Sequence, residues 1–431
     1  MKFTKNEKSW ILYDWANSAY ATIMLAAVFP IFFTSVCKAA GQSGDMWWGI
    51  GTSVSTAIVA ILSPILGAFG DYKGLKKNLL TGFLMTGLVF TGLCAFVNSW
   101  QLMLIGYTIS YIGFSGSCLF YDSFITDVTT PERMDKVSAW GYGMGYIGGS
   151  TIPFIASIAL ITFGENFGID ATMAVKISLL ITVVWWGAFS IPLLKNCKQL
   201  YGSEIPDKNI VKNTLTSLKS CIISMTKNKG ILFFIISYFF YIDGVNTVIN
   251  MATAYGSALG LDSVGMILAL LVTQVIAFPC AILFGKLSEK AGTIKMLISA
   301  IIIYFLICIL GFIMGFGMEE GFLSLSQANI MFWVLAALVG TVQGGIQALS
   351  RSYFGKLVPK EKSNEYFGVF DIFGKFAAIL GPMLYAVVKA TTGRSSFAIL
   401  AIILLFAIGL TSMLMGRKHY NKAEIKTPSK L

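Results

Sequence analysis

The stretch NLLTGFLMTGLVFTGLCAFVNSWQLMLIGYTISYIGFSGSCLFY, residues 78–121, contains no charged side chain over 44 consecutive positions. A helix needs roughly 20 apolar residues to cross the hydrocarbon core of a bilayer, so this stretch is too long for a single crossing. The polar tripeptide Asn98-Ser99-Trp100 interrupts it near the middle. The stretch therefore predicts two membrane-spanning helices joined by a tight turn.

Ten further runs of similar length and low charge bring the predicted number of spans to twelve. Membrane barrel strands alternate apolar and polar residues over about ten positions, whereas these runs are continuously apolar and twice as long. They predict helices, because a helix satisfies its own backbone hydrogen bonds in lipid. The ten runs are residues 15–37, 46–70, 137–164, 177–194, 230–257, 263–285, 296–318, 321–350, 366–388 and 395–416.

The composition agrees with an all-α polytopic membrane protein. Hydrophobic residues make up 56% of the chain and charged residues only 12%, about half the charged fraction of a usual soluble protein. The seven cysteines are scattered and His419 is the sole histidine, so we expect no disulfide framework, metal site or cofactor. No nucleophile–base pair is recognisable either, and an enzyme is not expected.

Basic residues predict the orientation. If the N-terminus lies in the cytoplasm and the spans alternate, 27 of the 32 lysines and arginines fall on the cytoplasmic side and 4 in the outer loops, while Lys375 falls inside a span. Cytoplasmic loops of membrane proteins carry such an excess. We therefore expect both termini to be cytoplasmic and the protein to lie in the cell membrane. The net charge of +11 is then a topology signal, and no nucleic-acid partner is expected.

The longest cytoplasmic loop, residues 195–229, divides the spans six and six. It predicts an N-terminal half at 1–194, a C-terminal half at 230–416 and a basic tail at 417–431. Apolar residues from Ile210 to Ile222 recur at helical spacing with lysines between them, which predicts an amphipathic helix lying on the inner leaflet.

The two halves repeat one loop motif. Each copy has a glycine, an acid four residues later, a glycine three residues after that and then a lysine. Later glycine and proline positions also repeat, at offsets of 228 and 229. Parallel six-span repeats are the architecture of major facilitator transporters. The first copy is Gly67, Asp71, Gly74 and Lys76, and the second is Gly285, Glu289, Gly292 and Lys295.

The first copy resembles the loop motif of the major facilitator superfamily, although Phe69 and Leu75 depart from it. A more specific resemblance rests on YDWANSAY at 13–20, QALSRS at 347–352 and FGKFAAILGP at 373–382. Together these segments resemble the vacuole-effluxer group of major facilitators, whose fungal members export amino acids from the vacuole. The resemblance implies the major facilitator fold with two six-helix pseudo-repeats.

The function implied is secondary active transport of small polar solutes by alternating access. Amino acids are the favoured substrates, with proton-coupled efflux as the coupling and a monomer as the working unit. An exporter of an organic anion or another small metabolite is the alternative. A membrane receptor or enzyme is a different class, disfavoured because no extramembrane domain is predicted.

Lys375 is the clearest candidate site residue, because an ionisable group inside a span is a functional hypothesis. It lies ten residues after Glu365, about 15 Å along a helix, which is near the midplane where facilitator substrates bind. Asp371 is one turn earlier, at a spacing that favours pairing. The alternative is a structural ion pair that only orders this span.

A second acidic pattern is found in spans one and seven. Asp14, Asn17 and Ser18 repeat as Asp243, Asn246 and Thr247 at an offset of 229. Gly244 and Asn250 are poor residues for a lipid-facing helix, so span seven is expected to open locally around a cavity. Asp14 could alternatively cap the start of span one.

A zwitterionic amino acid would suit these residues. We expect Lys375 to meet its carboxylate and Asp243 or Asp14 its ammonium. Hydrogen bonds are expected from Asn17, Tyr20, Asn246 and Gln347.

The loop motifs are interpreted as a cytoplasmic gate. Asp71 and Glu289 are each expected to face a helix N-terminus, where an anion is favoured. Arg133 and Arg351 are expected to form ion pairs that break when the gate opens inward.

The orientation can be tested by cysteine labelling. Cysteines placed at Asn98 and Glu319 should react with an impermeant thiol reagent from outside intact cells, because the charge bias places both sites in outer loops. A cysteine at Lys208 should react only after permeabilisation. Labelling of the Lys208 site in intact cells would reverse the orientation and remove the basis for the gate.

Overall fold

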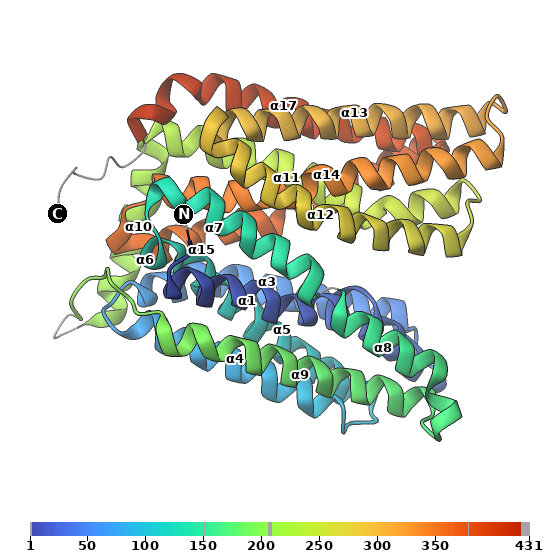
Figure 1. Cartoon of the computed structure of the whole chain (residues 1–431), viewed down its shortest axis with the longest axis horizontal. Helices are drawn as coiled ribbons and strands as arrows, with labels where there is room; N and C mark the ends of the chain where they lie inside the picture. Colours follow the sequence, from blue (N-terminus) through green and yellow to red (C-terminus); the bar gives the residue numbers. More distant parts are fainter. Residues whose placement is uncertain (1, 150, 206–208, 378, 424–431) are drawn as a thin grey trace. The chain divides into compact units, whose positions relative to one another are not determined.

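The computed structural model describes residues 2–149, 151–205, 209–377 and 379–423 (Figure 1). Over these residues the chain is almost entirely helical, with one isolated parallel bridge between Tyr72 and Ser203. Twelve segments are long and apolar enough to cross a membrane, which confirms the number of spans predicted from the sequence. Lys208 and the end of the basic tail, residues 424–431, lie outside the described residues.

Three of the first six spans are built from more than one helix. Span one contains α1, a π-helical turn and α2, span four contains α5 and the short α6, and span five contains α7, another π-helical turn and α8. The elements are α1 (Lys5–Tyr20), η1 (Ala21–Ala26), α2 (Val28–Ala39), α3 (Gly44–Gly70), α4 (Leu75–Cys94), α5 (Trp100–Ser123), α6 (Ile125–Val128), α7 (Pro131–Met144), η2 (Gly145–Gly149), α8 (Ile152–Phe163), η3 (Gly164–Phe167) and α9 (Ala171–Asn196).

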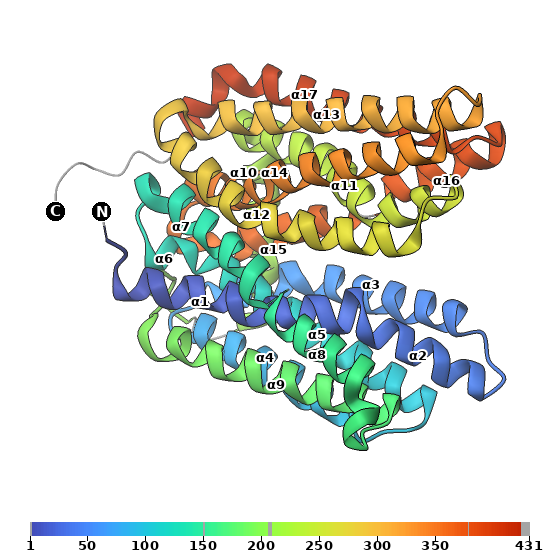
Figure 2. The same cartoon turned by 45° about the vertical axis from the view of Figure 1, so that its right-hand side comes forward.

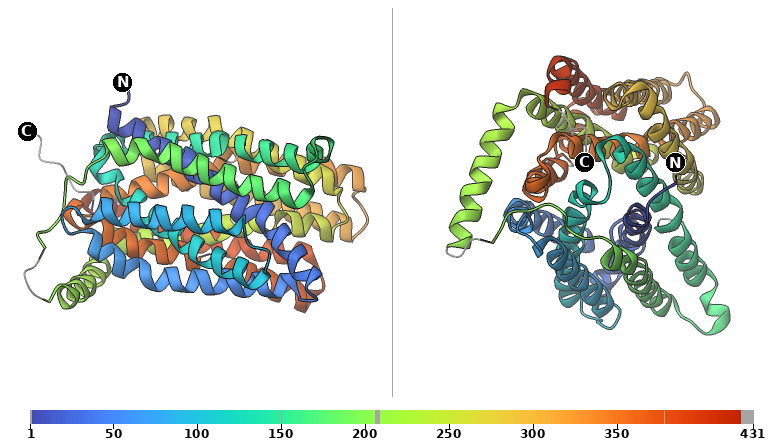
Figure 3. Two further views of the ribbon diagram at one scale, coloured as in Figure 1. Left: turned by 90° about the horizontal axis from the view of Figure 1, so that it is seen from below. Right: turned by 60° about the vertical axis from the view of Figure 1, so that its left-hand side comes forward.

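The predicted amphipathic segment is a helix, α10 (Ile210–Lys227), drawn in yellow-green in Figure 3. Its apolar residues Val211, Leu215 and Ile222 are exposed. The elements that follow are α11 (Lys229–Ala258), α12 (Ser263–Ala291), α13 (Thr293–Glu319), α14 (Leu325–Leu357), η4 (Lys360–Lys362), α15 (Ser363–Phe376), α16 (Leu380–Thr392) and α17 (Ser395–Ala423).

The helices divide into two compact units. Each unit also includes one short segment from the part of the chain that otherwise forms the other unit. Unit 1 comprises Met1–Thr130, Met144–Leu218 and Lys360–Val369. Unit 2 comprises Pro131–Gly143, Lys219–Pro359 and Phe370–Leu431. The start of α15 thus belongs to unit 1, and most of α7 belongs to unit 2. The linear division at the loop 195–229 stays a prediction of the sequence.

Several helices begin before the apolar runs that predicted them, because polar residues cap their first turns. α1 begins at Lys5, where Thr4 and Glu7 form a reciprocal capping box. Asn228 caps α11 and Asp170 caps α9 through bonds to backbone N–H groups. Side-chain oxygens at these positions satisfy donors that the helix leaves free. The idea that Asp14 caps span one is therefore wrong, since Asp14 lies inside α1 and is 8% exposed.

Span eleven was predicted as one helix, but it breaks between Phe376 and Leu380. Its second helix begins after Ile379, whose φ and ψ are −111° and −46°. Span five breaks at the corresponding place, after Thr151 with φ −102° and ψ −55°. A proline follows each break by two or three residues, and a proline removes a backbone donor from the helix. The repeat detected in the sequence therefore corresponds to a repeated interruption.

The expected opening in span seven is not found, because α11 runs without a break from Lys229 to Ala258. Gly244 instead allows α11 to pack closely against α17. A Cβ atom at Gly244 would lie 2.7 Å from the ring of Phe406 on α17, so only glycine lets these two helices approach so closely. The weak helix formers in this span mark a close helix–helix contact.

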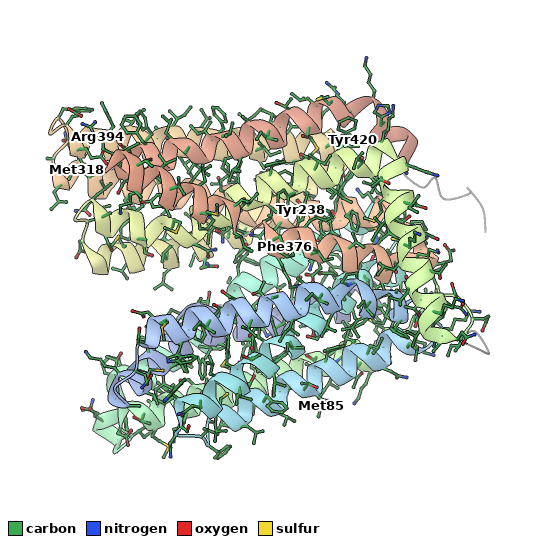
Figure 4. All side chains as sticks on the ribbon, turned by 180° about the vertical axis from the view of Figure 1, so that it is seen from behind. Met85, Tyr238, Met318, Phe376, Arg394 and Tyr420 are labelled. Atoms are coloured by element: carbon green, nitrogen blue, oxygen red, sulfur yellow. The ribbon has the colours of Figure 1, made fainter. Side chains whose placement is uncertain are left out.

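Each unit has an aromatic core of its own. In unit 1, α4 and α5 run side by side (Figure 3), and Tyr20 stacks on Phe114 at 4.4 Å between ring centroids. In unit 2, α13 and α17 run side by side (Figure 2), and Tyr304 stacks on Phe406 at 5.4 Å. Figure 4 shows α17 running from the end of unit 2 near Arg394 to the opposite end near Tyr420.

Candidate functional site

Asp243 is a fully buried carboxylate that lacks a complete set of partners. Its Oδ1 accepts a hydrogen bond of 3.0 Å from the backbone N–H of Gly381, at the start of α16. Its Oδ2 is buried and has no hydrogen-bond partner among the described residues. A buried charge with so few donors is costly unless a cation or a proton joins it. Asp243 is therefore a strong candidate for binding one of these.

The approach of α16 to Asp243 requires glycine at position 381. A Cβ atom there would lie 1.8 Å from Oγ1 of Thr247 and 3.0 Å from Oδ1 of Asp243. Thr247 is itself held by donating its hydroxyl to the backbone carbonyl of Asp243 at 2.7 Å. The interruption of span eleven thus delivers a backbone donor to a carboxylate on the neighbouring helix.

Unit 1 contains the same arrangement around Asp14. Ser18 donates its hydroxyl to the carbonyl of Asp14 at 2.7 Å, as Thr247 does to Asp243. A Cβ atom at Gly145, in the interrupted part of span five, would lie 2.6 Å from the hydroxyl of Ser18. The pattern repeated at an offset of 229 therefore shares a hydroxyl-to-carbonyl bond and a nearby glycine in both units, each beside a broken helix.

The other predicted polar residues of unit 1 have partners inside that unit. Asn17 donates to the sulfur of Cys118 at 3.7 Å. Tyr20 is fully buried, and its hydroxyl accepts from Ser110 at 2.9 Å. These contacts bind Tyr20 into the core of unit 1.

Asn246 and Gln347, on α11 and α14 of unit 2, are partly buried. Neither side chain makes a hydrogen bond to another residue within the described ranges. Their amide groups therefore remain able to bind a solute.

Lys375 and Asp371 form the ion pair predicted from their spacing, with Nζ of Lys375 contacting Oδ2 of Asp371. Their side chains are 11% and 26% exposed. Lys375 lies in the last turn of α15, where a helix favours positive charge. The residue that follows it, Phe376, is labelled in Figure 4. Lys375 and Asp243 are thus associated with the two sides of one interruption, at the end of α15 and the start of α16.

Asp71 is bound at the N-terminus of α15, as the gate hypothesis predicted. It accepts three hydrogen bonds of 2.9 Å, from the backbone and side-chain nitrogens of Asn364 and from the backbone N–H of Glu365. Gly67 allows this approach, since a Cβ atom there would lie 2.3 Å from the carbonyl oxygen of Asn364. All these residues belong to unit 1.

Lys76, the basic residue of the same loop, is buried against Asp127. Its Nζ lies 2.6 Å from Oδ2 of Asp127 and also donates to Ser363 at 3.1 Å. The other oxygen of Asp127 accepts from the backbone N–H groups of Leu200 and Tyr201. Both charges therefore have an ionic partner and further hydrogen bonds, which a buried pair needs in order to be stable.

Gln199 was not identified from the sequence, although it holds the whole loop. Its Oε1 accepts from the backbone N–H groups of Gly74 and Lys76, and its Nε2 donates to the carbonyls of Gly70 and Tyr72. Gly74 has a φ of +81°, which suits the tight turn. A single glutamine gives no periodic or motif signal, so only its position shortly after span six could have suggested this role.

The second copy of the loop motif differs from the first. Glu289 is exposed near the end of α12, so the prediction that it faces a helix N-terminus is wrong. The buried acid of this region is Asp135 on α7, which binds Thr293 at 2.6 Å, Ser352 at 2.7 Å and Lys356 at 2.7 Å. The reason is that Gly285 brings α12 against α7, with Asp135's carbonyl 3.3 Å from a Cβ built at that glycine.

Arg351 is buried in unit 2 and binds Ser138 on α7. Its Nε donates to the hydroxyl of Ser138 at 3.0 Å, and its guanidinium lies over the ring of Tyr142 at 4.4 Å. Arg133 lies in the first turn of α7, and Gly292 precedes α13 with a φ of +91°. Among the described residues, no group of three His, Cys, Asp or Glu side chains is placed to hold a metal ion.

Comparison with known proteins gives a consistent picture. The sequence matches the family described as "Vacuole effluxer Atg22 like" over residues 49–131 and 126–425. It is 45% identical to the uncharacterized MFS-type transporter YxiO of Bacillus subtilis, covering 95% of this chain and 94% of the relative. It is 25% identical to autophagy-related protein 22 of Yarrowia lipolytica, covering 67% of this chain and 52% of that protein. The chain thus spans about half the length of this fungal relative.

Solved structures share the fold at low sequence identity. The proton:xylose symporter XylE aligns with a TM-score of 0.69 and 12% identity over 96% of this chain and 95% of its own. The human organic anion transporter MFSD10 aligns with a TM-score of 0.68 and 13% identity over 95% of this chain and 99% of its own. These likenesses confirm the predicted fold of twelve helices.

The environment of Asp71 makes stability depend on pH. Burial raises the pKa of this carboxyl from 3.8 to about 7, although the bound N–H groups and Lys76 oppose the increase. The folded chain therefore holds an extra proton between about pH 4 and pH 7, and the stability contributed by Asp71 falls as pH rises through that window. Between pH 5.5 and 7.0 the loss should be about 1.6 kcal/mol relative to Asp71→Asn.

Unfolding of the purified protein in detergent at several pH values would measure this difference. Asp262→Asn is the matched control, because Asp262 is an exposed helix cap and should leave the pH profile of the wild type unchanged. Parallel profiles for wild type and Asp71→Asn would contradict the prediction.

Proposed function

This chain is a major facilitator transporter of the vacuole effluxer Atg22-like family, and we propose that it carries small zwitterionic solutes, amino acids above all, by alternating access. The observation that supports this proposal most strongly is the pair of opposite charges at the interruption of span eleven. Lys375 lies in the last turn of the helix before the break, and Asp243 accepts a hydrogen bond from the backbone N–H of Gly381 in the first turn of the helix after it. A zwitterion carries one group for each.

Asp243 suits the ammonium group. Its free oxygen needs a donor, and an ionised carboxylate with one neutral hydrogen bond costs several kcal/mol to bury. A bound ammonium or proton removes that cost. The same oxygen can therefore couple substrate binding to protonation, since a proton and an ammonium compete for one position.

Lys375 suits the carboxylate group. Its ammonium pairs with Asp371, and that pair is partly exposed. A substrate carboxylate would exchange with Asp371 at little cost, because one charged partner replaces another. Asn246 and Gln347 could add hydrogen bonds.

The proposed cytoplasmic gate consists of two segments, the start of α15 in unit 1 and most of α7 in unit 2. The start of α15 is bound to unit 1 through Asp71, and α7 is bound to unit 2 through Asp135 and Ser138. We propose that release toward the cytoplasm requires both segments to leave these partners. The protein would work as a monomer in the cell membrane with both termini cytoplasmic.

An organic anion or another small metabolite is the alternative substrate class. Such a solute would use Lys375 and leave Asp243 for a proton. A receptor or enzyme is not favoured, because the relatives and structural neighbours described above are transporters. Counterflow in proteoliposomes with a library of amino acids and organic anions would distinguish the two substrate classes.

Replacement of Lys375 tests whether the ion pair is functional or structural. Lys375→Met should abolish flux while leaving folding intact, and Lys375→Arg should not restore it fully because a planar guanidinium differs from a compact ammonium. Lys389→Met, at the other end of the same span, is the control and should transport normally. If the double variant Asp371→Asn, Lys375→Met regains full flux, the pair is structural and binds no substrate.

Replacement of Asp243 separates ammonium binding from protonation. If Asp243 binds the substrate ammonium, Asp243→Asn should lower amino-acid counterflow at least tenfold. If it binds only a proton, counterflow should persist while accumulation driven by a pH gradient is lost. Asp262→Asn serves as control in the same unit. Wild-type behaviour in both assays would remove Asp243 from the site.

A further inference from the structure

Unit 2 contains a partly open cavity that the transport proposal does not use. It has a volume of about 90 Å³ and is lined by α11, α12, α13, α14 and α17. Its wall is mainly apolar, with Cys308, Phe332 and Ala336 among the lining residues. All lining residues belong to unit 2, so the cavity is a property of this unit alone.

Two primary amides interrupt the apolar wall, and neither is satisfied. Oε1 of Gln274 is buried, and no described residue is a hydrogen-bond partner for it. Gln343 is 3% exposed, and its side chain makes no hydrogen bond within the described part of the chain. The other polar groups of the wall are satisfied, since Tyr255 donates to the carbonyl of Gly311 and Thr273 to that of Ala336. Burying unpaired amides lowers stability unless a ligand completes them.

We propose that this cavity binds a small neutral molecule with an apolar body and one carboxamide or hydroxyl group. None of the described residues that line the cavity is charged, so an ion would be buried without a partner. An amide offers both a donor and an acceptor, which a carboxamide or hydroxyl can complement. The volume is smaller than the cavity of about 150 Å³ that holds benzene in another protein, so a branched molecule of about five or six heavy atoms fits.

The cavity is separate from the carboxylate site on the same helix. Val248, Ala252 and Tyr255 line it from α11, whereas Asp243 and Thr247 contact α16. With 3.6 residues per turn, these two sets lie on different faces of α11. Binding in the cavity therefore does not depend on the proposed transport function.

Cys308 provides a reporter inside the cavity, and Cys94 provides its control. Both thiols are 1% exposed, but Cys94 belongs to unit 1 and lies against Gly106. The full chain in detergent would be treated with methyl methanethiosulfonate, with isobutyramide as the neutral probe and isobutyrate as its charged counterpart. Modification of each cysteine would be followed by peptide mass spectrometry, and thermal unfolding would be recorded in parallel.

Isobutyramide should slow the modification of Cys308 at least fivefold and raise the unfolding temperature, without changing Cys94. Isobutyrate should do neither. The variant Gln274→Leu, Gln343→Leu should need at least tenfold more isobutyramide for the same effects, and Ala336→Leu, which fills the cavity, should abolish them. If Cys308 proves unreactive, the unfolding temperature decides. Absence of any effect of isobutyramide on wild type, or an equal effect on the leucine variant, would overturn the proposal.

Discussion

Backbone groups that a spanning helix leaves free must find partners inside the protein, because lipid offers none. This constraint applies twice in span eleven. The span contains two helices, and the first N–H groups of each helix need an acceptor. In both cases an aspartate from another helix or loop supplies the acceptor. Asp71 accepts hydrogen bonds at the start of α15, and Asp243 accepts one at the start of α16. The rest of the arrangement depends on these two carboxylates.

The two aspartates differ in how completely they are satisfied. Asp71 accepts three hydrogen bonds, and the neighbouring pair of Lys76 and Asp127 is equally well supplied. Asp243 accepts one, and its Oδ2 has no partner in the part of the chain that the structure describes. A polar network in which every group is hydrogen-bonded favours a single geometry. A network with an unpaired group favours binding of a partner that supplies the missing hydrogen bond. The same chemical group thus makes a saturated contact at Asp71, and at Asp243 it has the unsaturated environment on which the proposed binding role rests.

The sequence predicted the spans well because uncharged runs of about 20 residues have one physical explanation in a long chain. It failed where packing decided the outcome. Gly244 was interpreted as a helix opening, but it accommodates the ring of Phe406. The break in span eleven was missed because Pro382 lies after it, inside a helix of its own. Asp135 was overlooked in favour of Glu289, since a repeated motif does not show which acid the glycine contact at Gly285 buries. The paired charges at Asp371 and Lys375 were predictable from spacing alone.

The helix α15 has a mechanical consequence. It passes from unit 1 to unit 2 between Val369 and Phe370, and its 14 residues form a rod about 21 Å long. A single stiff helix thus carries at its start the backbone groups that Asp71 binds and in its last turn the residue Lys375.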